Sequence, residues 1–313
     1  MNAADLSNAF DVRYGIPQPR WQPVLDSLGE DPREWGPFLA DWTDRVAAAL
    51  GPNGRVYETE RAIVVADVAG DHAERSVRVV RSAVDLIEHL CLPSDHSDRA
   101  WPRLFLVIED QERYYDFAAG AMEASDELYA SLGGDVISPG NTDPETETAH
   151  EEIASAGISF RLGYAHILAG YRRDDYFAHV IAHEFTHAAN LSRQLPPWLD
   201  EGVAEVMAAR FMYGKRYEDL FAVDRLVWQD TVDCWSRNGL EAFWTGHAFA
   251  NLELSDAAYT LAPRLAINLI HRCGEDGFRA FLDSGPWDDH GESAVRKAMG
   301  LSLDEFAASM LRT

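Results

Sequence analysis

The order of apolar patterns along the chain constrains the fold more than any other feature of the sequence. AIVVA at 62–66 is a short β-branched run and RLFLVIED at 103–110 is a continuous apolar run, so both predict strands, the second buried on both faces. A helical pattern follows each of them, at 71–90 and again after 110. ISFRLGYAHILAGYR at 158–172 predicts extended chain, and nearly everything from 174 onward has helical periodicity.

This order predicts an α+β fold, in which a lobe with a small mixed sheet packs on an α-helical lobe. Residues 1–60 are expected to form a mostly helical lead-in, 61–192 the α+β lobe and 193–313 the helical lobe, with 61–313 as one catalytic unit. GYAHILAGYR at 163–172 is interpreted as an edge strand that can pair with an extended peptide, with an ordinary internal strand as the alternative.

Charge and composition exclude several classes of partner. The formal net charge is −25, which argues against nucleic acid and anionic membranes because phosphates would be repelled. The acidic segment at 140–157 is interpreted as solvated surface. Three scattered cysteines predict reduced thiols, and no apolar run reaches the roughly 18 residues that a membrane span needs. With no secretory signal visible at the start, we expect a cytoplasmic protein.

The stretch HVIAHEFTHAAN at 179–190 contains His-Glu-x-x-His within a predicted helix that Asp174 and Asp175 can cap. Residues four apart lie about 40° apart around a helix, so His183 and His187 project from one face. Two imidazoles placed in this way can ligate a single zinc ion. Glu184 lies beside that face and is the candidate general base, a group that takes a proton from the attacking water.

The next stretch, LPPWLDEGVAEVMAARF, supplies the remaining groups. Its two prolines can open a second helix, which places Glu201 in the first turns as a third zinc ligand. Gly202 leaves room for close approach of another backbone, and Glu205 lies on the same face as Glu201, where it can accept the outer N–H of a ligating histidine. Two histidines, one carboxylate and an open position are typical of catalytic zinc, whereas structural zinc has four protein ligands.

AHEFTH followed by PPWLDEGVAE resembles the gluzincin metallopeptidases, most of all the peptidase MA-like bacterial group. The resemblance covers about 160–208 and implies a thermolysin-like fold, zinc on His183, His187 and Glu201, and Glu184 as general base. It extends weakly to AYTLAPRLAINLIHRCGEDGFRAFL at 258–282. There it implies that Tyr259 stabilises the oxyanion, the negatively charged oxygen of the tetrahedral intermediate. His247 is the second candidate for that role.

Other residues near the motif have plainer interpretations. His179 lies one turn before His183 and is interpreted as an exposed or cleft-wall residue, and Trp198 as an anchor in the core. The sequence therefore predicts a zinc-dependent peptidase acting on a peptide or protein substrate. The alternative is a zinc-bound protein without catalytic activity that senses or binds a partner protein. Hydrolysis of an ester or epoxide on the same scaffold is a third, weaker alternative.

Overall fold

The computed structural model describes residues 9–28, 32–91, 103–131, 157–162, 164–214 and 225–312, so the acidic segment lies outside them except for Gly157. The chain divides into two compact units, each formed by two segments. Met1–Asp85 with Ser97–Glu184 form the first, and Leu86–His96 with Phe185–Thr313 form the second. The expected lead-in at 1–60 thus falls within the first unit. The division falls inside one continuous helix, α5 (Tyr176–Asn190), and not at 192.

The strands that the structure describes all belong to the first unit and form two sheets. A small one pairs β1 (Phe10–Arg13) with β2 (Ile16–Pro19). The larger has the order β3-β4-β5-β7-β6, with β3 (Arg55–Glu58), β4 (Ala62–Ala66), β5 (Arg103–Ile108), β6 (Gly157–Leu162) and β7 (Tyr164–Gly170). Its three middle strands run parallel and its two outer strands antiparallel to their neighbours, so the sheet is mixed, as expected.

The interpretation of 163–172 as an edge strand is wrong. Strand β7 lies inside the sheet, where it pairs with β5 on one side and with β6 on the other. The edge position goes to β6, because it immediately precedes β7 and folds back on it as a hairpin. The alternative, an ordinary internal strand, is therefore confirmed.

The first 60 residues contain more strand than their helical pattern predicts. Among the residues of this segment that the structure describes, α1 (Trp21–Leu28) and α2 (Pro32–Leu50) are helices, but β1, β2 and β3 are strands. Tyr14 and Gly15 turn the chain between β1 and β2 with φ of 50° and 77°, the left-handed conformation that suits a two-residue hairpin. Prolines in β2 lack an N–H and argue against a strand, but a two-stranded ribbon tolerates them because both strands are edges.

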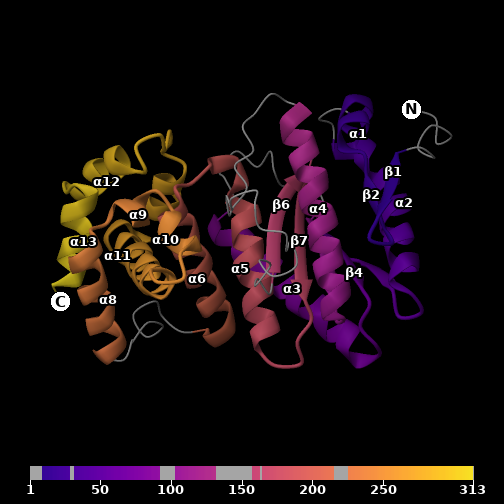
Figure 1. Cartoon of the computed structure of the whole chain (residues 1–313), viewed down its shortest axis with the longest axis horizontal. Coiled ribbons are helices and arrows are strands. Elements are labelled where there is room, and N and C mark those ends of the chain that lie inside the picture. Colours follow the sequence, from indigo (N-terminus) through magenta and orange to yellow (C-terminus); the bar gives the residue numbers. More distant parts are fainter. Residues whose placement is uncertain are drawn as a thin grey trace. The chain divides into compact units, whose positions relative to one another are not determined.

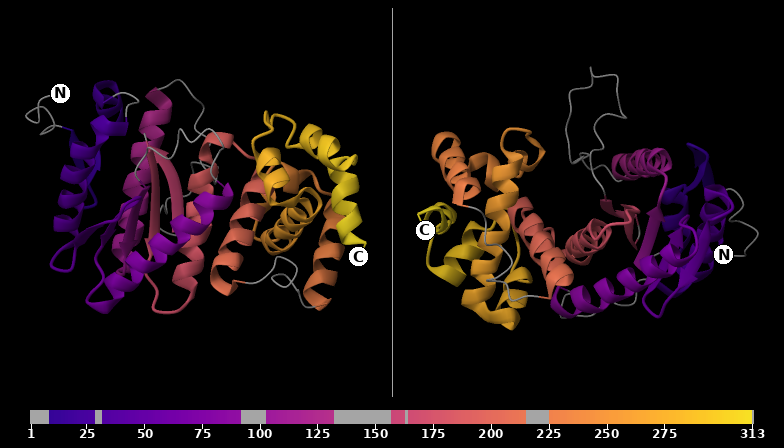
Figure 2. Two further views of the ribbon diagram at one scale, coloured as in Figure 1. Left: turned by 180° about the vertical axis from the view of Figure 1, so that it is seen from behind. Right: turned by 90° about the horizontal axis from the view of Figure 1, so that it is seen from below.

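Helices cover both faces of the larger sheet (Figures 1 and 2). Strand β5 is buried along its whole length, as predicted, and its residues alternate between the faces. Leu104, Leu106 and Ile108 share a core with Trp35 of α2 and Phe117 of α4 (Gln111–Ser131). In the figures α3 (Asp71–Cys91) crosses the opposite face. The strands and helices expected between 62 and 131 are thus confirmed.

The second unit is helical in the residues that are described. After α5 come η3 (Leu191–Arg193), α6 (Pro197–Tyr213), α8 (Arg225–Asn238), α9 (Glu241–Trp244), α10 (His247–Ala250), α11 (Ser255–Leu282), α12 (Glu292–Met299) and α13 (Leu303–Leu311). Gly274 interrupts α11 with non-helical angles, φ 69° and ψ 169°. The chain therefore has an α+β fold, and within the described ranges no helix is long and apolar enough to cross a membrane.

Candidate metal centre

Helix α5 forms where the motif predicts it. The side chain of Asp174 accepts a hydrogen bond from the amide of Tyr176 at 3.2 Å and so satisfies a donor at the start of the helix. Phe177, Ile181 and Phe185 are fully buried and hold one side of the helix in the core. The three histidines, spaced four residues apart, and Glu184 are only half-buried, so this side of α5 is partly open.

Helix α6 begins at the two prolines, as predicted. Pro196 is the N-cap and Pro197 is the first helical residue, where a missing N–H costs nothing. Trp198 is fully buried, and its indole N–H donates to the carbonyl oxygen of His290 at 2.8 Å, which confirms it as a core anchor. These contacts fix the first turn of α6, which carries the candidate carboxylates.

Gly202 allows α6 to lie very close to α11. A Cβ atom at this position would be 2.6 Å from the carbonyl oxygen of Ala262 and 3.3 Å from the Cβ of Ala266. Real Cβ atoms are not found so near a backbone oxygen, so any larger residue would push the helices apart. The predicted close approach of another backbone at Gly202 is confirmed. The same packing of α6 on α11 also restricts the position of Glu201, the preceding residue.

The predicted ligands come together on α5 and α6. Ligand atoms of His183, His187 and Glu201 all lie within 4.8 Å of one another. His187 Nε2 and Glu201 Oε2 are 3.7 Å apart. Two ligands of a tetrahedral zinc with bonds of about 2.0–2.1 Å are separated by about 3.3–3.4 Å, so this pair needs only a small movement to share an ion. All three side chains are half-buried.

Asp200 makes a contact that the sequence reasoning missed. Its Oδ2 lies 2.7 Å from His187 Nδ1, so the carboxylate accepts the Nδ1–H hydrogen bond. This bond fixes the ring orientation and leaves Nε2, the nitrogen nearest Glu201, to ligate a metal. The sequence carried a signal, since Asp200 directly precedes the candidate ligand Glu201, but only the helix geometry shows which nitrogen it reaches.

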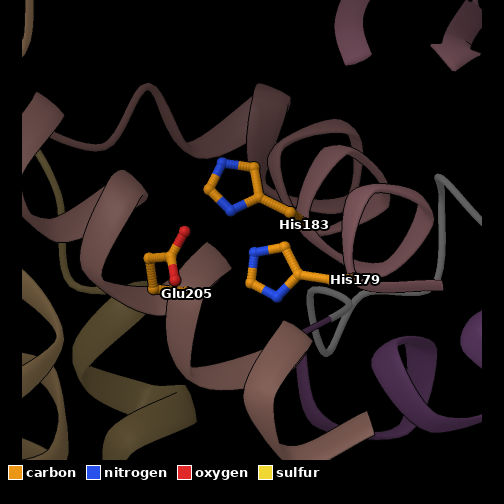
Figure 3. A group of neighbouring side chains, drawn as sticks. All are labelled: His179, His183 and Glu205. Atoms are coloured by element: carbon orange, nitrogen blue, oxygen red, sulfur yellow. The ribbon is translucent and has the colours of Figure 1, made fainter. Parts of the chain in front are cut away.

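Glu205, predicted to orient a ligating histidine, lies one turn beyond Glu201. Its carboxylate forms a second group with His179 and His183, whose ligand atoms also lie within 4.8 Å of one another (Figure 3). His179 is half-buried and stacks on His183, with ring centroids 6.0 Å apart and planes at 26°. His179 is therefore one of the clustered side chains, and its interpretation as an exposed or cleft-wall residue stays a prediction. The predicted role of Glu205 stays a prediction.

Three residues beside the zinc ligands were predicted as catalytic groups, namely Glu184, Tyr259 and the second candidate His247. Glu184 follows His183 on α5 and is half-buried. Tyr259 lies near the start of α11, is 40% exposed and packs edge-on against Phe249, with ring centroids 5.2 Å apart. His247 on α10 is exposed, and its Nδ1 lies 3.4 Å from the hydroxyl of Thr245. The roles of all three stay predictions.

The three cysteines are free thiols, as expected, although Cys273 is only half-buried. Burial raises the pKa of the Cys91 thiol to about 12, so this group stays protonated at neutral pH. Within the part of the chain that is described, the groups whose donors come close enough to hold a metal contain only histidine and glutamate. Comparisons of the chain with models of protein families, with curated proteins and with solved structures find no match.

Proposed function

We propose that this protein is a zinc-dependent peptidase of the gluzincin type, with a thermolysin-like catalytic fold. The observation that carries the proposal is the convergence of His183, His187 and Glu201 from two successive helices. Two imidazoles and one carboxylate are the donor set of catalytic zinc, and they leave a coordination position for water or substrate. The Asp200 hydrogen bond to His187 supports it further, because ligating histidines generally donate their other N–H to a carboxylate or carbonyl.

When bound, zinc would polarise the scissile carbonyl and make water more acidic. The protein supplies the proton transfer through Glu184. This carboxylate takes a proton from the attacking water as the C–O bond of the tetrahedral intermediate forms, and delivers it to the leaving amine when the peptide C–N bond then breaks. Glu184 lies about 100° around α5 from His183, so it is beside the ligands and does not point with them.

Two further features belong to the proposal. Tyr259 is proposed as the donor to the oxyanion, with His247 as the second candidate, because an additional hydrogen bond there would stabilise the transition state. The substrate is proposed to be a peptide or protein, since a net charge of −25 disfavours nucleic acid.

The substitution Glu184→Gln tests the proposal. It removes the proton acceptor and leaves the three ligands, so we expect zinc content to be unchanged and hydrolysis of a peptide pool to fall about 10²–10⁴-fold. Glu253→Gln, at an exposed position, is the matched control and should behave as the parent. A Glu184→Gln protein that cleaves as fast as the parent would contradict the mechanism. A zinc-loaded parent that cleaves neither the pool nor an unfolded protein would favour the non-catalytic alternative.

A further inference from the structure

The candidate ligands form two parallel rows along α5 and α6. His179, His183 and His187 follow one another at intervals of four residues on α5, and Glu201 and Glu205 do the same on α6. His187 is grouped with Glu201, whereas His179 is grouped with Glu205. Residue numbers thus fall along one helix as they rise along the other, which is the arrangement of an antiparallel helix pair. The ligand pattern of the first group repeats one turn away.

The second group resembles the first in its geometry. Its ligand atoms also lie within 4.8 Å of one another, and its three side chains are half-buried. In Figure 3 the two imidazole rings and the carboxylate face one another around a common space. Tyr176 stacks on the far side of His179, with centroids 5.6 Å apart and planes at 11°, so the His179 ring is held from both sides by aromatic neighbours.

We propose that His179, His183 and Glu205 form a second divalent-cation site that shares His183 with the first. The inference rests on the proposed zinc site for its shared ligand. Two imidazoles and one carboxylate suit zinc and similar first-row metals in the second site as they do in the first. Because an imidazole normally ligates through one nitrogen, an ion that uses His183 in one group leaves only two ligands in the other. The two sites are therefore filled alternately.

The two positions differ in what they can do. A shift of four residues moves an ion about 6 Å along the helix axis. Residues 183 and 187 flank position 184 along α5, whereas 179 and 183 both precede it. We therefore expect an ion in the second site to be less well placed than one in the first for proton transfer by Glu184. The Asp200 hydrogen bond orients His187, a ligand of the first site only, so we expect the first site to bind more tightly than the second.

Paired substitutions separate the two sites. His187→Ala/Glu201→Gln removes ligands only from the first, and His179→Ala/Glu205→Gln removes ligands only from the second. Zinc per chain is measured after dialysis against buffered zinc, and cobalt(II) is titrated while its ligand-field absorption is recorded. An exposed pair, His271→Ala/Glu253→Gln, is the matched control. The unfolding transitions of the metal-free proteins show whether each variant folds, and Glu201→Gln alone is the milder variant.

We expect one zinc ion per chain in the parent, in the control and in either site variant, with weaker binding and an altered cobalt spectrum in His187→Ala/Glu201→Gln. Combining all four substitutions should abolish binding. A folded His187→Ala/Glu201→Gln protein that binds no metal, beside a His179→Ala/Glu205→Gln protein that does, overturns the second site and leaves the proposed function intact. Two ions bound at once by the parent would overturn the shared ligand. A parent that binds no metal overturns both proposals.

Discussion

Two clusters of polar side chains in this protein use the same residue types in different ways. At the carboxyl end of the sheet, Asp67 accepts a hydrogen bond from the amide of Glu109 at 2.7 Å, and His72 Nδ1 lies 2.8 Å from the hydroxyl of Tyr171. Each of these two side chains is thus hydrogen-bonded to a residue that directly follows a strand of the sheet, Glu109 after β5 or Tyr171 after β7. On α5 and α6, by contrast, imidazole and carboxylate atoms from several residues converge on shared positions.

The difference distinguishes a structural role from a ligand-binding one. A buried polar group is costly unless it is hydrogen-bonded. Asp67 connects the ends of β4 and β5, and His72 connects the start of α3 with Tyr171 after β7. In the helix pair, Asp200 accepts a hydrogen bond from His187, whose other ring nitrogen lies 3.7 Å from the Glu201 carboxylate, in reach of a shared ion. Substituting a residue in the helix pair should therefore reduce zinc binding. Substituting the same residue type at the end of the sheet should change the stability of the fold and leave zinc binding as it is in the parent.

The largest contrast is expected between His183→Gln and His72→Gln. His183 belongs to both candidate ligand groups, so its loss should reduce zinc binding by more than the roughly 10–100-fold that an orienting partner contributes. His72→Gln weakens one hydrogen bond, which should lower the free energy of unfolding by about 0.5–1.5 kcal/mol and leave zinc content unchanged. Zinc analysis and denaturant unfolding measure both. Equal loss of zinc in the two variants would remove the distinction between the clusters.

Asp200→Asn and Asp67→Asn form the second contrast. Asp200→Asn exchanges a charged acceptor for a neutral one at His187 Nδ1, so we expect zinc affinity to fall about 10–100-fold. Asp67→Asn should leave zinc affinity as it is in the parent. Competition with a chromophoric chelator measures the affinities, and Asp276→Asn, at a fully exposed position, controls for the loss of one charge. Parent-like affinity in Asp200→Asn would show that the hydrogen bond does not orient a ligand.

Asp67→Asn should instead change how stability depends on pH. Burial raises the pKa of Asp67 above its ordinary value of 3.8, so the folded state holds the proton more firmly than the unfolded state. In the parent, the firmer binding of this proton therefore contributes fully to the free energy of unfolding below about pH 3.8. The contribution is lost as the pH rises through the pKa that Asp67 has in the folded state. The advantage of the variant over the parent in unfolding free energy should grow from pH 4 to pH 7. A constant or shrinking difference would contradict the burial of an ionised carboxylate.

The most local contrast compares two helical glycines. Gly202→Ala forces a Cβ against the Ala262 carbonyl and should destabilise the protein by about 1–3 kcal/mol, as overpacking does. Gly36→Ala, in α2, meets nothing within 4 Å and should stabilise it by about 0.5–1 kcal/mol. Thermal unfolding distinguishes the two. A stabilising Gly202→Ala would show that α6 and α11 are less closely packed than the structure indicates.

The strongly periodic segments were predictable from sequence alone. Strand β5 is a continuous apolar run and α3 has a regular apolar face, so local pattern sufficed for both. The β1–β2 hairpin was missed because its register depends on the turn at Tyr14 and Gly15, and prolines obscure β2. The interior place of β7 depends on which strand folds back on which, and this is decided by the whole sheet.

Within the site, sequence spacing was enough to predict that His183, His187 and Glu201 lie together. The helix period and the start of a second helix at the prolines are both local properties of the sequence. The contact of Asp200 with His187 and the grouping of His179 with His183 and Glu205 were not predicted. Which nitrogen of His187 faces Asp200, and which turn of α5 faces Glu205, depend on the rotation of one helix against the other. The position of α6 depends in turn on tertiary packing such as that of Gly202 on Ala262 of α11, which sequence periodicity does not contain.

Zinc X-ray absorption spectroscopy on the purified, zinc-loaded protein tests the central claim most directly. The account predicts a first shell of nitrogen and oxygen at about 2.0–2.1 Å, with the multiple scattering of two imidazole rings that is reduced in His183→Gln. A sulfur shell at about 2.3 Å, or a spectrum unchanged by His183→Gln, would contradict a centre built from α5 and α6.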